Sequence, residues 1–163
     1  MEVGVAHRGL AFMSFLAGDF VDARLHCEQA LATCNPERNR EARERSGEDT
    51  EPVAMAMLAM ASWQLGEVDR ARELIEAANG RAAAIGHVPS LAMPLQLKCM
   101  LDILRGDALA ALAASEALEA MSQEHGMALQ HTWAELDLSW AHGRLHDAKT
   151  GAATLQQALA ELA

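Results

Sequence analysis

Residues 16–23 read LAGDFVDA, and similar segments follow at 64–71 (QLGEVDRA), 104–111 (LRGDALAA) and 141–148 (AHGRLHDA). Each segment has a glycine, a polar residue directly after it and an alanine five positions beyond the glycine. A glycine can end a helix because it adopts the left-handed conformation that other residues disfavour. The small alanine lets the next helix pack closely on the previous one. The pattern therefore predicts four helix–turn–helix units, with turns at Gly18, Gly66, Gly106 and Gly143.

Apolar residues at helical spacing lie on both sides of each turn, which supports paired amphipathic helices. Two further glycines, Gly86 and Gly126, each lie twenty residues after a turn glycine and predict the ends of second helices. The middle units thus repeat at about 40 residues. Helix pairs of this kind bury their apolar stripes only against neighbouring pairs. We expect an all-α fold, a right-handed α-solenoid of about four antiparallel hairpins in a single domain over residues 1–163.

The composition is typical of such a helical array. Hydrophobic residues make up 51 % of the chain, but aromatic residues only 4 %, and there is no tyrosine. A net charge of −10 argues against nucleic acid and anionic membranes as partners, because both attract cationic proteins. The sequence has neither a secretory leader pattern nor a long apolar run, so we expect a cytoplasmic protein. The three cysteines lack CxxC spacing, which favours reduced thiols.

A charged segment, NPERNREARERSGEDTEP, occupies residues 35–52 and separates the first unit from the second. It contains ten charged residues and no large apolar one. The sequence therefore predicts a solvated connection over residues 35–51, with one or two exposed helical turns, and Pro52 as the first residue of the next helix. A docking loop is the alternative interpretation. The expected hairpins cover about residues 2–34, 52–86, 89–125 and 127–162.

The first unit, LAGDFVDARLHCEQALATCNPE, resembles a tetratricopeptide hairpin, with Gly18, Ala23, Ala30 and Pro36 at matching offsets. The order CNPERNREARERSGEDTEPVAMAMLAMASWQLGEVDRA, AIGHVPSLA, LRGDALAA and EHGMALQHTWAELDLSWAHGRLHDA is similar to the C-terminal repeat region of large bacterial signalling proteins. Those proteins carry an adenylate/guanylate cyclase or DNA-binding domain, and then a signal-transduction ATPase domain, before the repeats. The chain departs from that pattern at SGEDTEP, where a more apolar run is expected. The resemblance implies a tetratricopeptide-like regulatory repeat region without the parent's catalytic domains.

In a tetratricopeptide array the first helix of each hairpin lines the concave surface, at positions roughly thirteen, ten, six, three and two residues before the turn glycine. These offsets select the candidate groove residues Arg8, Phe12, Phe15, Met60, Trp63, Gln64, Gln96, Met100, Trp133, Asp137 and Trp140. Methionine and aromatic side chains suit the adaptable capture of a helix or peptide. The alternative is that the same tryptophans and methionines fill the interhelical core.

No catalytic or metal-binding motif stands out. The best histidine pair, His142 and His146, is interrupted by Gly143, which we expect to break the helix between them. The chain lacks GxSxG, HExxH, GxxxxGK[ST] and GxGxxG. We therefore expect no enzyme activity, no cofactor and no metal site.

The sequence thus favours a non-catalytic protein-interaction or regulatory module. It would bind a protein or peptide partner, or pack against other domains of a parent protein. The alternative is a small-molecule effector sensor that controls an attached ATPase or cyclase. An enclosed pocket around Met60, Trp63 and Met100 would favour the sensor. The last helix carries an apolar stripe, Leu155, Leu159 and Leu162, which predicts a homodimer through the C-terminal helix or coverage by further repeats.

Overall fold

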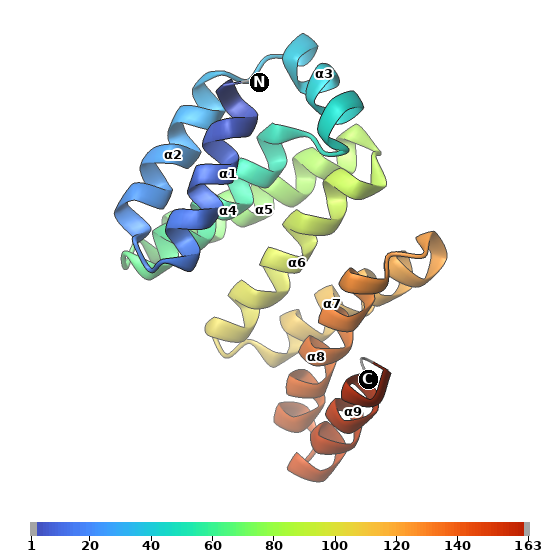
Figure 1. The fold of residues 1–163 in the computed structure, drawn as a ribbon. Coiled ribbons are helices and arrows are strands. Elements are labelled where there is room, and N and C mark those ends of the chain that lie inside the picture. Colours follow the sequence, from blue (N-terminus) through green and yellow to red (C-terminus); the bar gives the residue numbers. More distant parts are fainter. Residues whose placement is uncertain (1–2, 162–163) are drawn as a thin grey trace. The chain divides into compact units, whose positions relative to one another are not determined.

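The computed structural model describes residues 3–161, and over that range the chain forms nine α-helices (Figure 1). They are α1 (Val3–Leu16), α2 (Phe20–Ala32), α3 (Pro36–Ser46), α4 (Thr50–Gln64), α5 (Val68–Ile85), α6 (Val88–Leu104), α7 (Ala108–His125), α8 (Ala128–Leu145) and α9 (Ala148–Glu161). The prediction of an all-α fold built from successive antiparallel helices is confirmed. Leu162, the last residue of the expected C-terminal stripe, lies outside the described residues, as does the first residue of the expected hairpin 2–34.

The chain divides into two compact units, one up to Leu97 and one from Lys98 onward, and the boundary falls within α6. In the first unit α1 packs on α2, α2 packs on α4 and α4 packs on α5, while α3 makes a smaller contact with α4. In the second unit α7 packs on α8 and α8 packs on α9. Several of these contacts join helices that follow each other along the chain, as Figure 1 shows for α1 with α2 and for α8 with α9.

Three of the four predicted turns lie where the glycine pattern puts them. Gly18, Gly66 and Gly106 have φ of 80°, 83° and 72°, the left-handed conformation that favours glycine. After two of these glycines an aspartate caps the next helix. The Asp19 side chain accepts a hydrogen bond from the Asp22 amide, and the Asp107 side chain accepts one from the Ala110 amide.

The fourth turn lies three residues after the predicted one. Gly143 is part of α8, which continues to Leu145, and His146 is the residue between α8 and α9. Asp147 then takes the capping role, because its carboxylate accepts the Thr150 N–H at 2.8 Å. The prediction that Gly143 ends a helix is therefore wrong.

The glycine that permits a close approach of α8 and α9 is Gly151, which faces Gly143. A Cβ atom added to Gly151 of α9 would lie 2.7 Å from the Gly143 Cα and 2.7 Å from the Ser139 carbonyl oxygen. Gly151 thus lets α8 and α9 cross at a point where a side chain on α9 would collide with the backbone of α8. Counted from His146, Gly151 occupies the fifth position, where the other units have Ala23, Ala71 and Ala111.

The charged segment is more ordered than the sequence predicts. Residues 36–46 form the helix α3, longer than the one or two turns expected, and Gly47 ends it with φ of 77°. The next helix begins at Thr50 with Asp49 as its N-cap, so Pro52 is not its first residue, as predicted, but its third. The physical reason is the cap, because the Asp49 carboxylate accepts the Glu51 N–H at 3.0 Å and starts the helix two residues early.

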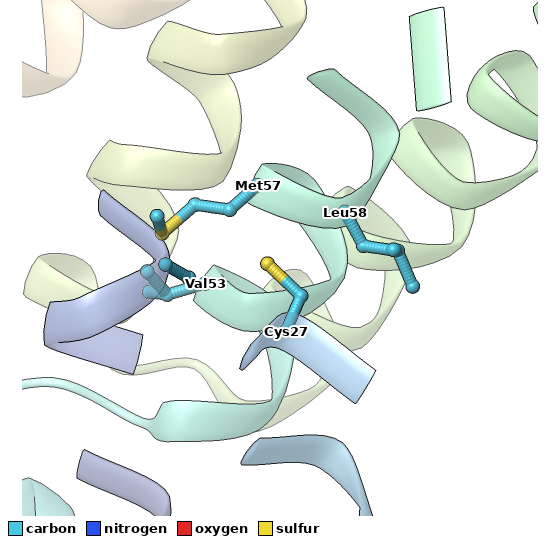
Figure 2. Close-up of a cluster of buried hydrophobic side chains, with 5 residues drawn as sticks. Cys27, Val53, Met57 and Leu58 are labelled. Carbon is cyan, nitrogen blue, oxygen red and sulfur yellow. The ribbon is translucent and has the colours of Figure 1, made fainter. Parts of the chain in front are cut away.

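Small and medium apolar side chains build the interior of the first unit. Ala11, Cys27, Val53, Met57 and Leu58 form one buried cluster, and in Figure 2 the Cys27 side chain of α2 points toward α4, which carries the last three. Many of the other buried apolar residues are alanines, which permit close contact between helices.

Candidate binding surface

In the first unit, four of the predicted groove residues are open to solvent at least in part. The Phe12 side chain on α1 is 47 % exposed. Phe15 is partly exposed and meets Phe20 edge-on, with ring centroids 5.3 Å apart. Near the end of α4, Trp63 is partly exposed and Gln64 is exposed. These side chains belong to the last turns of two first helices, α1 and α4.

Three other predicted residues of the first unit are largely withdrawn from solvent. Met60 is 2 % exposed and Gln96 is 7 % exposed. The Arg8 guanidinium pairs with the Glu48 carboxylate at 2.7 Å, and the Arg8 side chain is 15 % exposed. Met60 therefore lies in the interior, which is the alternative that the sequence left open for the methionines.

In the second unit, Trp133 and Trp140 lie on α8, and Met100 lies on α6. Trp133 is 45 % exposed, and Trp140 and Met100 are partly exposed. The Arg144 guanidinium lies 6.0 Å from the centroid of the Trp140 ring, a cation–π arrangement. The first helix of the fourth hairpin, α8, thus presents two tryptophans and an arginine to solvent.

Asp137 was predicted to be a groove residue only because it lies six residues before Gly143, where the turn was expected. It is buried, 8 % exposed, and it contributes to the raised pKa of Cys99, after burial of that thiol. Counted from His146, Trp133 and Trp140 remain at the groove offsets, thirteen and six residues before the turn, whereas Asp137 falls nine residues before it.

The corrected count adds two residues that the glycine pattern missed, Leu136 and Arg144, ten and two residues before His146. A signal for them was present in the sequence. Gly66, Gly106 and His146 are spaced by 40 residues each, whereas Gly143 breaks this period.

All aromatic side chains of the protein are at least partly exposed. The chain has six phenylalanines and tryptophans and no tyrosine, and none of the six is buried. They are Phe12, Phe15, Phe20, Trp63, Trp133 and Trp140. Five of them lie on the first helices of hairpins, and Phe20 starts a second helix. The core is built without the side chains that would bury the most apolar area.

A buried polar network, which the sequence did not indicate, joins α3, α4 and α6 within the first unit. The Asp49 side chain is 1 % exposed and pairs with the Arg43 guanidinium. The Asp49 amide donates to the Ser90 hydroxyl oxygen at 2.7 Å, and the Ser90 oxygen lies 2.8 Å from His87 Nδ1. This network holds the start of α4 in place and explains why the charged segment is ordered.

Ion pairs connect the outer surfaces of α2 and α5. The Glu67 carboxylate accepts from Arg24 at 2.8 Å and from Arg70 at 2.9 Å, and Arg70 also pairs with Glu28 at 2.9 Å. The hydrogen bond from Arg70 is the main cause that lowers the pKa of Glu67. Arg24 and Glu28 lie on α2, Arg70 lies on α5, and Glu67 is the residue before α5.

A shallow cleft of about 270 Å³ lies in the first unit, beside the start of α1. Its lining residues come from α1, the end of α2, α3 and the start of α4, and they are Val3, Gly4, Val5, Thr33, Cys34, Arg38, Asn39, Glu41 and Thr50. Burial, and then the charges of Glu51 and Asp49, raise the pKa of Cys34 to about 11. The thiol is therefore protonated at neutral pH and is a poor nucleophile.

The other thiols and the histidine pairs offer little reactive chemistry. Burial is the main cause that raises the pKa of both Cys27 and Cys99 to about 12. His142 and His146 do lie close, with ring centroids 5.8 Å apart, because α8 continues through the glycine between them. In the part of the chain that the structure describes, no three His, Cys, Asp or Glu side chains gather in a way that could hold a metal ion.

Between residues 3 and 161, no helix combines the length and apolar character that crossing a membrane requires. A comparison with protein-family models finds none that matches the chain, and a comparison with curated proteins finds no significant match.

Proposed function

We propose that the chain is a non-catalytic protein-interaction module, a right-handed solenoid of tetratricopeptide-like hairpins that captures a segment of a partner protein through aromatic side chains on its first helices. The repeated layout supports the architecture. Turn residues at 66, 106 and 146 recur every 40 residues, and each is followed, five positions later, by a buried Ala or Gly. This recurrence is the mark of stacked helical hairpins.

The observation that carries the binding function is the position of the aromatic residues. Burying a Phe or Trp side chain is among the largest single gains available to a folding domain. This chain leaves all six at least partly exposed and fills its core with alanine, leucine and other aliphatic side chains. Trp and other aromatic residues dominate the binding energy of protein interfaces. Exposed aromatic residues at recurring positions are therefore best explained by a partner that buries them.

The charge of the chain narrows the chemistry of that partner. A net charge of −10 attracts cationic segments and repels acidic ones. The partner segment is therefore one that combines apolar anchors with lysine or arginine. It belongs to a cytoplasmic protein or to another domain of a larger signalling protein, in line with the resemblance to bacterial regulatory repeats.

The test is affinity capture of partners, followed by binding measurements with a purified partner. Two double variants each remove two aromatic residues from one unit, Phe12→Ala with Trp63→Ala in the first unit and Trp133→Ala with Trp140→Ala in the second. We expect at least one of them to weaken binding about 30-fold, the effect of losing about 2 kcal/mol at an interface hot spot. The matched control is Leu109→Ala on the second helix α7, where Leu109 is 70 % exposed. Equal affinity of both double variants and the wild type would reject the proposal.

A second candidate function, the sensing of a small effector, rests on the cleft beside α1. At about 270 Å³ the cleft is slightly smaller than most ligand pockets, and Met60, Trp63 and Met100 do not line it. Its Arg38 and Asn39 side chains suit a small polar or anionic molecule. A metabolite that raises the melting temperature of the wild type, but not of a Val5→Trp variant with a filled cleft, would favour the sensor over peptide capture.

A further inference from the structure

Three positions on the first helices of the second and fourth hairpins are buried in the same way. They lie twelve, eight and five residues before the turn residue. In α4 they are Ala54, Leu58 and Ala61, which are 0 %, 3 % and 0 % exposed. In α8 they are Ala134, Leu138 and Ala141, which are 0 %, 6 % and 0 % exposed. One side of both helices is therefore a closed packing face.

The second helix of the preceding hairpin packs against each of these first helices. In the first unit α2 packs on α4, and in the second unit α7 packs on α8. Cys27 of α2 shares one buried cluster with Leu58, and Leu31 of α2 packs against that cluster. The same interface, a second helix on the following first helix, is thus formed twice within the chain.

On α1 the corresponding face is open. The equivalent positions are Ala6, Leu10 and Met13, counted back from Gly18. Leu10 is 48 % exposed and Met13 is 62 % exposed, and Ala6 is partly exposed. Gly9, between them, has free space where a side chain would be. The α1 face therefore has the apolar character of the closed faces and lacks their covering helix.

On α9 the complementary face is open. The ninth residue after the turn is Cys27 in α2, Ile75 in α5 and Ser115 in α7, and these are at most 1 % exposed. The equivalent residue in α9, Leu155, is 38 % exposed. Leu159, which corresponds to the partly buried Leu31 of α2, is 51 % exposed. The chain thus carries both halves of its internal interface, each unpaired.

We propose that α9 of one copy of this chain packs on α1 of the next copy, head to tail, and so repeats between copies the interface that α2 forms with α4. Leu155 and Leu159 then take the places of Cys27 and Leu31, and they bury Leu10 and Met13. None of these four α1 and α9 side chains is charged, so the pairing needs no charge to be desolvated. Such an interface is heterologous, because two different surfaces meet, and it leaves an open end at each step.

The experiment measures mass against protein concentration by sedimentation and light scattering, with two blocked variants. The head-blocked variant is Leu10→Glu with Met13→Glu, and the tail-blocked variant is Leu155→Glu with Leu159→Glu. We expect the wild type to grow beyond its monomer mass of 17.5 kDa as concentration rises. Each blocked variant alone stays a monomer. An equimolar mixture of the two forms a heterodimer of twice the monomer mass and nothing larger, since one open head meets one open tail.

The control variant Leu109→Glu alters an exposed leucine on α7, outside both faces, and assembles like the wild type. Circular dichroism establishes that each blocked variant keeps its helical content, which the exposure of the four substituted side chains allows. A wild type that is monomeric at every concentration overturns the proposal, as does a mixture that stays monomeric. A homodimer of the head-blocked variant would instead indicate α9 on α9, and one of the tail-blocked variant α1 on α1. We expect the variant Phe12→Ala with Trp63→Ala to assemble like the wild type. The proposals of self-association and of partner capture can therefore be rejected independently of each other.

Discussion

The second and fourth hairpins have the same layout and reverse the chain in different ways. Between α4 and α5 the chain turns at Gly66, whose φ is 83°. Between α8 and α9 it turns at His146, whose φ is −114°. Both turns are followed by an acidic residue, Glu67 or Asp147, and by a small residue five positions on. What defines the turn is therefore the acidic residue and the small contact residue, while the glycine is one of several ways to reverse the chain.

The starts of these two hairpins differ most, and they give the largest expected effect. Asp49 caps α4, is buried and pairs with Arg43, whereas Met127 precedes α8 and offers no side-chain cap. We expect Asp49→Ala to lower the free energy of unfolding by about 3 kcal/mol, from the lost cap and the lost charged hydrogen bond. Met127→Ala is expected to stay within about 0.5 kcal/mol of the wild type. Urea unfolding measures both.

An Arg43→Ala variant separates the two contributions. If the pair matters, the double variant Asp49→Ala with Arg43→Ala loses clearly less than the sum of the single losses. If each single variant loses little free energy of unfolding and the double variant loses their sum, the buried network does not hold the start of α4.

The small contact residue gives the next effect. A methyl group at Gly151 would come within 2.7 Å of the Gly143 Cα and of the Ser139 oxygen, both backbone atoms. We expect Gly151→Ala to cost about 1–3 kcal/mol through overpacking of α8 against α9. The reciprocal change in the second hairpin, Ala71→Gly, costs about 1–2 kcal/mol, because glycine lowers helix propensity and the buried methyl group is lost. Thermal unfolding of the two variants compares them, and an unaffected Gly151→Ala would contradict the close crossing.

Gly66 and Gly143 look equivalent in sequence, but replacing each by alanine should change the free energy of unfolding in opposite directions. Gly66→Ala forces a side chain into the left-handed region and should destabilise by about 1–2 kcal/mol. At Gly143 an added Cβ meets the Gly151 Cα at 3.6 Å, an ordinary contact, within a helix. Gly143→Ala should therefore stabilise by up to about 1 kcal/mol. Denaturant midpoints decide the signs, and losses of equal size would refute the register described above.

The smallest effect is a difference in pH and salt dependence. Hydrogen bonds lower the pKa of both acidic turn residues, mainly from Arg70 for Glu67 and from the Thr150 amide for Asp147. Because both pKa values are lower in the folded protein, the stabilisation is present above the pKa of the unfolded carboxyl groups and is lost as pH falls through the folded values. We expect stability to decline below about pH 4.

The stabilisation at Glu67 should depend on salt concentration, and that at Asp147 should not. Glu67 is stabilised by side-chain charges, which 1 M salt screens within about 3 Å, whereas Asp147 binds backbone amides. Glu67→Gln should therefore reduce the salt dependence of the acid transition, and Asp147→Asn should leave it unchanged. Unfolding followed at several pH values in low and high salt tests this difference.

The sequence predicted the helices and three turns because those features depend on local chemistry. Left-handed glycines and apolar periodicity act within a few residues, and Gly18, Gly66 and Gly106 follow that rule. Gly143 did not, because it lies within α8 and faces Gly151 of α9, a contact between helices that no local pattern reveals. The full length of α3 was also missed, since the contact of Asp49 with Ser90 joins residues far apart in the chain. Phe12 and Met60 both lie six residues before their turn glycine, yet Phe12 is exposed and Met60 is buried. Burial depends on which helix lies opposite, so equal offsets did not give equal environments.

The register of the fourth hairpin is tested most directly by the backbone carbon chemical shifts of residues 140–150 in solution. The account predicts helical Cα shifts without interruption through Gly143 to Leu145, a break at His146 and helical shifts again from Ala148. Non-helical shifts at Gly143 with helical values resuming at Arg144 would contradict it.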